Sequence, residues 1–256
     1  MKSTAIYLFA LLTLLCSCKS EYLTNAMFQN DVQYMAKAHS TDSVKTHTYA
    51  SGVLAIHSGD QFGNAYGTAG MLNVYQSHTL AEPNLNVAYG VFGYAGNYSR
   101  TSDNNNSKST ADFSKGFSGI GGNFSISGYI PGKKADWRVL GVDVMYSKEF
   151  GDYAAFRKQG INNDDYTFYP SSRLFTWGLF SEVLIKNSDD VSLGFKLGLY
   201  NSPNQPHRVE GLPINNVNLN AVVGYRHLMF ISSLKLIPTD VFLFPSGFQI
   251  GAAYRF

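Results

Sequence analysis

The last ten residues constrain the fold most strongly, because their side chains alternate in character up to the final residue. One side of this segment is apolar or aromatic and carries Phe248, Ile250, Ala252, Tyr254 and Phe256. The other side carries Gln249, Gly251, Ala253 and Arg255. A period of two is typical of a strand whose two faces meet different surroundings. An apolar face opposite a small or charged face suits a barrel wall with lipid outside and polar groups inside.

Composition points in the same direction. Of the 256 residues, 45% are apolar, 14% aromatic and only 15% charged, and the chain has 24 Gly and 17 Tyr. This mixture favours many short strands over a bundle of helices. The formal net charge is +2, and no run of Lys and Arg is present. Nucleic acid is therefore not expected as a partner.

The N-terminus has the features of an export signal. Lys2 precedes an apolar run from Ala5 to Leu15, which is too short to span a bilayer and has the length of a secretory signal. The run ends in Leu15-Cys16-Ser17-Cys18, which resembles the bacterial lipoprotein box. This resemblance implies that residues 1–17 are removed and that Cys18 is acylated and held at a membrane leaflet. An ordinary cleaved signal is the alternative.

Residues 18–46 are expected to form a lipidated tether, with a short helix as one option. Apolar side chains recur there at roughly helical spacing, at Met27, Phe28, Val32, Met35 and Ala38. Such a helix could plug the barrel, lie on the membrane surface or dock to a partner. A loosely ordered spacer fits the same residues.

Residues 47–256 are expected to be one domain, an all-β, antiparallel, up-and-down transmembrane barrel of about ten strands. The alternating segments are 47–58, 63–80, 85–100, 117–131, 137–150, 172–187, 190–203, 216–227, 228–237 and 247–256. Short connections alternate with longer ones along the chain. Because outer-membrane barrels have short periplasmic turns, we expect the longer loops outside the cell and both chain ends in the periplasm.

Contents of the lumen decide what such a barrel can do. Strand parity predicts that six charged residues face inward, namely Asp143, Glu182, Lys196, Arg226, Lys235 and Arg255. Their signs are mixed, which favours an ionic network that closes the lumen, with a selectivity filter or proton path as the alternative. If the turn at 187–189 is centred on Asp189, Glu182 and Lys196 lie directly opposite each other on neighbouring strands.

No catalytic residue is assigned from the sequence, and no cofactor or metal is expected. Asp164 and Asp165 could form a carboxylate pair with His57 or His207, but neither a Gly-x-Ser-x-Gly nor a His-Glu-x-x-His stretch is present. His207 and Glu210 alone cannot supply the three or four ligands that a metal needs. The chain is therefore predicted to be non-enzymatic.

The C-terminal Tyr254 and Phe256 resemble the terminal aromatic signal that outer-membrane barrels present to their assembly machinery. Together with the lipoprotein box, this resemblance defines the bacterial outer-membrane β-barrel class and no particular family. It implies contact with outer-membrane lipid and with the barrel-assembly machinery. We expect a surface or envelope component with an unidentified envelope protein partner, as a subunit of an export, uptake or adhesion assembly. The alternatives are a narrow channel, an envelope hydrolase and a soluble β-sandwich lipoprotein.

Overall fold

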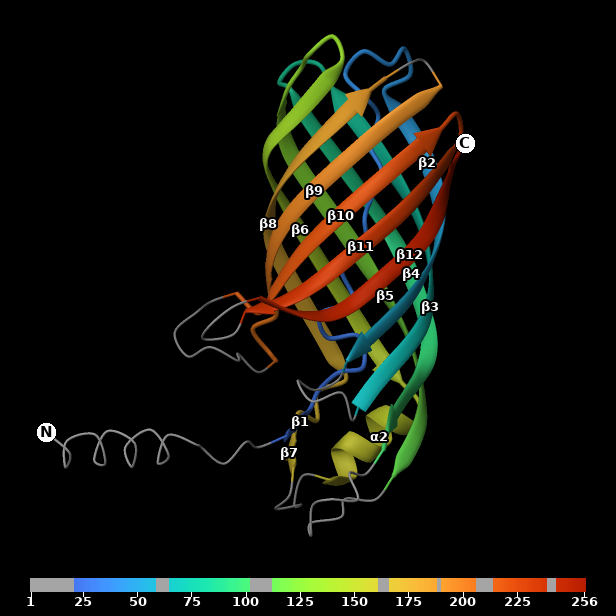
Figure 1. Ribbon diagram of the computed structural model, residues 1–256, viewed down its shortest axis with the longest axis vertical. Helices are drawn as coiled ribbons and strands as arrows, with labels where there is room; N and C mark the ends of the chain where they lie inside the picture. Colours follow the sequence, from blue (N-terminus) through green and yellow to red (C-terminus); the bar gives the residue numbers. More distant parts are fainter. Residues whose placement is uncertain are drawn as a thin grey trace, which may run out of the picture.

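The main body of the molecule is a closed barrel of ten antiparallel strands (Figure 1). This computed structural model describes residues 21–58, 65–101, 112–160, 166–187, 190–205, 214–238 and 243–256. Each barrel strand pairs with the next one along the chain, and β12 pairs with β2 to close the ring. The predicted up-and-down barrel is confirmed, and the β-sandwich alternative is wrong because the strands form one closed sheet.

The barrel strands begin and end close to the predicted segments. They are β2 (Thr46–Ser58), β3 (Ala65–Leu80), β4 (Leu85–Arg100), β5 (Phe113–Ile130), β6 (Ala135–Phe150), β8 (Arg173–Lys186), β9 (Val191–Asn201), β10 (Asn216–Tyr225), β11 (Leu228–Pro238) and β12 (Leu243–Arg255). The largest difference at a strand start is at β5 and β12, each of which starts four residues earlier than expected. The last strand has the predicted parity, since Ile250 is 55% exposed and Gln249 is buried.

Large apolar side chains cover the outside of the barrel. Leu54, Leu72, Val91 and Ile120, on four consecutive strands, are each at least 65% exposed. The inward positions between such residues are small or polar, as at Asn73. An apolar surface of this extent costs free energy in water, and it matches the lipid-facing band of a transmembrane barrel.

The two ends of the barrel differ. At one end, which we call the hairpin end, the connections are short and the chain finishes at Phe256. At the other, which we call the loop end, the connections are longer and carry the helix α2 (Asp152–Gln159). A parallel pair of short strands, β1 (Glu21–Leu23) and β7 (Tyr166–Phe168), also lies at the loop end (Figure 1). Among the described residues, no helix is long and apolar enough to cross a membrane.

Arginine at the middle of the lipid-facing wall should destabilise the barrel more than arginine at its edge. Leu72 lies near the middle of β3, and Leu80 is the last residue of the same strand. Leu72→Arg is expected to lower the free energy of unfolding in lipid vesicles by about 2–4 kcal/mol, and Leu80→Arg by about 0–1 kcal/mol. Denaturant titration followed by tryptophan fluorescence measures both. Equal losses would contradict the membrane placement.

Candidate functional site: a chain segment threaded through the barrel

The barrel lumen is occupied by the protein's own N-terminal segment. We call residues 24–40 the thread: it follows β1 at the loop end and leads to β2 at the hairpin end. Every residue from 25 to 39 is buried. In Figure 1 the blue chain that follows β1 runs inside the barrel toward the opposite end. Filling the barrel was one of the placements expected for a helix in this segment, and the segment does lie in the lumen.

The thread is not helical, so the helix option for this segment is wrong. Residues 26–30 form turns, in which the Phe28 amide donates to the Asn25 carbonyl over 3.0 Å, and residues 31–39 have no regular secondary structure. An α-helix with its side chains is about 10–12 Å wide. The lumen of a ten-stranded barrel is narrow and already holds inward side chains, so an extended chain fits where a helix does not.

An extended chain leaves its backbone groups without partners from its own secondary structure, and the barrel wall supplies them. Wall side chains donate to thread carbonyls in four places: Asn216 Nδ2 to Gln29 (2.9 Å), Gln249 Nε2 to Asn30 (2.7 Å), Lys235 Nζ to Val32 (2.8 Å) and Arg138 Nη2 to Ala38 (3.0 Å). These donors come from β10, β12, β11 and β6. In the other direction, the Ala36 amide donates to the Tyr75 hydroxyl of β3 over 2.7 Å. The wall therefore holds the thread from several sides.

At the loop end a buried carboxylate holds the thread where it enters. Glu149 Oε2 accepts a hydrogen bond from the Ala26 amide over 2.7 Å, and Glu149 Oε1 pairs with Arg157 Nη2 of α2 over 2.6 Å. The Tyr153 hydroxyl, also on α2, donates to the Thr24 carbonyl over 3.1 Å. Sequence reasoning missed Glu149, although it shares the strand parity of Asp143, which would have placed it inward.

Two carboxylates hold the lumen between its middle and the hairpin end. Glu182 Oε1 accepts from the Tyr34 hydroxyl over 2.6 Å, and Glu182 Oε2 pairs with Lys37 Nζ at 3.4 Å and with Arg138 Nη1 at 3.3 Å. Tyr34 and Lys37 belong to the thread, so this carboxylate joins the thread to the wall. Asp143 is the second carboxylate. Its Oδ2 pairs with Lys196 Nζ at 2.5 Å and accepts from the Tyr200 hydroxyl over 2.6 Å.

Four of the six charged residues predicted to face inward do so. Asp143, Glu182, Lys196 and Lys235 are at most 4% exposed. Glu182 and Lys196 are register partners on β8 and β9, which confirms their predicted opposition. The ion pair of Lys196 is nevertheless with Asp143 on β6.

The other two of the six residues lie at the hairpin end. The placement of Arg226 in the lumen is wrong, because β10 ends at Tyr225 and Arg226 belongs to the reversal that follows, with a φ of 53°. Its side chain is 61% exposed and pairs with Asp190. Arg255 is the last residue of β12, and its side chain is 24% exposed. It lines the mouth of the barrel and is not deep in the lumen.

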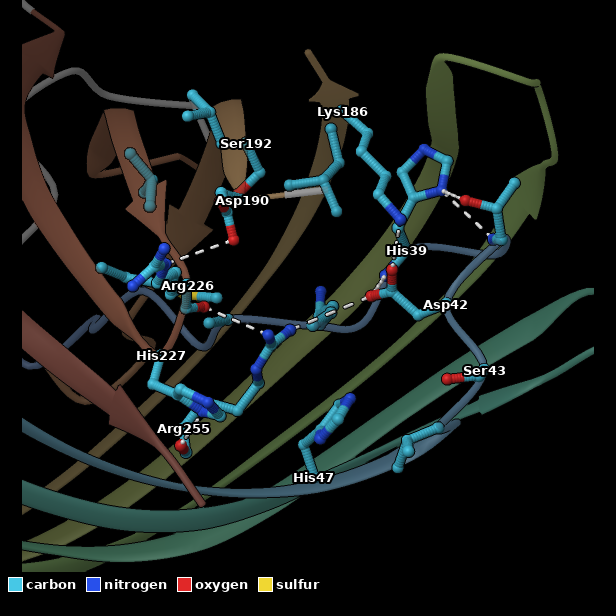
Figure 2. A pocket seen from close by; sticks show the side chains of 18 of the residues that line it. His39, Asp42, Ser43, His47, Lys186, Asp190, Ser192, Arg226, His227 and Arg255 are labelled. Carbon is cyan, nitrogen blue, oxygen red and sulfur yellow. Dashed lines mark hydrogen bonds and ion pairs between the residues drawn. The ribbon is translucent and has the colours of Figure 1, made fainter. Parts of the chain in front are cut away.

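The thread leaves the barrel beside a cavity of about 580 Å³ at the hairpin end. The Ser40 amide and hydroxyl both donate to Asp136, each over 2.5 Å. Just beyond, Asp42 lies 3.1 Å from Lys186 Nζ and 4.0 Å from Arg255 Nη1, and Figure 2 shows both cationic side chains reaching toward it. His39 Nε2 lies 3.5 Å from Oδ1 of the same Asp136 carboxylate. These contacts anchor the second end of the thread.

One glycine of the wall makes room for the thread. A Cβ atom on Gly247 of β12 would lie 3.0 Å from both Asn30 Nδ2 and Asn30 Oδ1. By contrast, a Cβ atom on Gly70 of β3 would have no neighbour within 4 Å, and Gly70 is on the exposed face. At Gly247 the thread therefore packs so closely on the wall that a side chain there would collide with Asn30.

The remaining candidate residues are not gathered into one site. Cys18, Asp164, Asp165 and His207 lie outside the described residues. His57 is buried in the wall near the loop end, with its ring centroid 6.2 Å from that of Tyr98. In the part of the chain that the structure describes, no group of three or more His, Cys, Asp or Glu side chains could hold a metal ion. The terminal Tyr254 and Phe256 are 44% and 70% exposed, with their rings packed edge to face.

No protein-family model and no curated protein matches the chain. Among solved structures it is similar to Neisserial surface protein A, at 10% identity and a TM-score of 0.35, covering 82% of this chain and 95% of that one. The Escherichia coli outer membrane protease OmpT is 10% identical, with a TM-score of 0.39 and coverages of 86% and 99%. The β domain of the Bordetella autotransporter BrkA is 13% identical, with a TM-score of 0.41 and coverages of 83% and 100%. All three TM-scores lie below 0.5, so the class of this chain, a transmembrane β-barrel, rests on its own strand pairing and exposure pattern.

A disulfide should form between the thread and the wall where Asn30 meets Gly247. A Cβ atom on Gly247 would lie 3.0 Å from Asn30 Nδ2 and Oδ1, so cysteine side chains at the two positions point at each other. Asn30→Cys with Gly247→Cys is expected to give a mobility shift on a non-reducing gel after mild oxidation of the folded full-length protein. Asn30→Cys with Gly70→Cys is the matched control and should give none, because Gly70 faces outward. Failure of the first pair to cross-link would contradict the threaded lumen.

Loss of the Glu182 carboxylate should cost far more stability than loss of an exposed one. Glu182→Gln leaves Lys37 and Arg138 buried without their carboxylate, which is expected to lower the free energy of unfolding by about 3–5 kcal/mol. Asp190→Asn breaks the exposed pair with Arg226, at a cost of about 0–1 kcal/mol. Denaturant unfolding in detergent, with heat-dependent gel mobility as the test of folding, compares the two. Similar losses would show that Glu182 does not bind the thread in the folded state.

Proposed function

We propose that the protein is a non-enzymatic β-barrel lipoprotein of the bacterial outer membrane, acylated at Cys18, that acts as an envelope component and as a subunit of a larger assembly. The observation that carries this proposal is the occupied lumen. A pore must offer its solute an open path, whereas this lumen holds fifteen consecutive buried residues of the protein itself, 25 to 39. The barrel is thus a scaffold that holds a protein segment across the membrane.

The loop end supplies the surface for a partner in this proposal. Aromatic rings stiffen it: the Tyr98 and Tyr153 rings stack with centroids 4.4 Å apart, and the Phe113 and Phe156 rings lie 4.8 Å apart. Phe168 of β7 packs edge to face on Phe156 at 5.9 Å. Since Phe113, Phe156 and Phe168 are only partly buried, this end combines a rigid support with accessible aromatic edges. Aromatic side chains on a rigid support are favourable anchors for protein partners.

A narrow channel is the second candidate, and polar groups on the inner face of the wall favour it. The side-chain amides of Asn73 and Asn218 are buried and make no hydrogen bond to described protein atoms. Such groups need water as a partner, so the lumen is polar enough to hold water next to the thread. In this hypothesis the thread is a removable plug. A hydrolase built on Asp164 and Asp165 stays a hypothesis that their substitution by Asn would test.

Conductance separates the scaffold from the channel. The full-length protein in a planar bilayer is expected to give no steady current, because the thread fills the lumen. A variant that lacks residues 24–40 and still shows heat-dependent gel mobility should give discrete current steps, because the polar wall then surrounds water. Steady conductance by the full-length protein, altered by Glu182→Gln, would instead establish the channel.

A further inference from the structure

The path of the thread determines on which side of the membrane the N-terminus lies. β1 pairs with β7, which belongs to the connection between β6 and β8 at the loop end. The thread then contacts Glu149 near the loop end, Glu182 in the half of the barrel nearer the hairpin end and Asp136 at the hairpin end, in the order of its own sequence. It therefore crosses the lumen once, and β2 begins at the hairpin end, where Phe256 also lies.

The two ends of the described chain consequently lie on opposite faces of the barrel. This overturns the expectation that both chain ends share the periplasmic side. Figure 1 shows the C-terminus at one end and β1, β7 and α2 at the other. The difference arises because the tether was expected to precede the barrel on the side where β2 starts, whereas it reaches β2 through the barrel.

Chain length then limits where Cys18 can be. Three peptide units separate Cys18 from Glu21, and they span at most about 11 Å. The apolar band of an outer-membrane barrel is about 25 Å tall. As long as β1 remains paired with β7, Cys18 cannot return to the hairpin face. An acyl group on Cys18 must therefore enter the lipid leaflet nearest the loop end.

We propose that the barrel displays its acylated N-terminus on the outer face of the membrane, so that the protein is anchored in the outer leaflet. The thread connects this anchor to β2 through the lumen of the same barrel. This inference rests on the proposed function, which supplies the acylation of Cys18, and on the expectation from the sequence that the longer loops face outside the cell. One part of the inference does not depend on acylation or orientation: the N-terminus lies on the same face of the barrel as the longer loops, opposite the hairpin turns.

The contacts along the lumen make this sidedness stable. The thread is held at the loop end by Glu149 and α2, nearer the hairpin end by Glu182, and at the hairpin end itself by Asp136. Withdrawal of the thread toward either face would break all of these contacts together and leave buried wall charges without partners. Acyl chains would also have to pass a lumen that is packed with side chains.

Epitope insertion into the full-length protein tests the sidedness. One tag is placed between Ser20 and Glu21, a second between Pro83 and Asn84 in the β3–β4 turn at the hairpin end, and a third within residues 102–111 in the β4–β5 connection at the loop end. Antibody labelling is compared on intact and on permeabilised cells. The first and third tags are expected to label on intact cells, and the second only after permeabilisation.

Two other outcomes would overturn the proposal. If the N-terminal tag follows the hairpin tag, the thread does not cross the lumen in the cell. If the N-terminal and loop tags both need permeabilisation, the thread is correct, the surface display is wrong and the longer loops face the periplasm. Incorporation of labelled palmitate, compared with Cys18→Ala, reads the acylation separately. If Cys18→Ala leaves incorporation unchanged, the lipid anchor fails whatever the tags show.

Discussion

The need of an extended backbone for hydrogen-bond partners underlies the rest of this structure. A chain without regular secondary structure cannot cross a membrane in contact with lipid, because its amide and carbonyl groups would have no partners there. Inside the barrel, side chains such as Asn216, Lys235 and Gln249 provide those partners. The barrel wall thus acts toward the thread as a polar solvent, and toward the bilayer as an apolar surface. Both roles are met by alternate residues of the same strands.

The mixed charges of the lumen follow from this arrangement. A lumen that guides ions of one sign would gain from charges of the opposite sign, whereas a lumen that holds a protein segment gains from local pairs. Glu182 accepts a hydrogen bond from Tyr34 and pairs with Lys37 and Arg138, and Asp143 pairs with Lys196. Such pairs are stable only when every partner is present, since a buried charge that loses its partner is costly. The thread is therefore part of the folded core of the barrel and not an appendage to it.

Much of the wall could be predicted from the sequence, because a strand with lipid on one side must alternate. Parity alone placed Asp143, Glu182, Lys196 and Lys235 inside, and the turn length set Glu182 opposite Lys196. Parity failed at Arg226, because the strand had already ended and the rule no longer applied. The inward positions of Asp136 and Arg138 could have been found in the same way, since both flank the outward Trp137, which is 49% exposed.

The sequence by itself determined the barrel, its number of strands and its apolar exterior, because these follow from a local repeat of two residues. Only the tertiary structure decided where residues 24–40 lie, whether they are helical and on which face the chain begins. The spacing of the apolar residues Met27, Val32 and Met35 suits a helix on a membrane surface as well as an extended chain packed inside the barrel. The choice depends on partners that are far away in sequence, such as Glu149, Glu182 and Gln249, and they meet the thread only when the barrel closes.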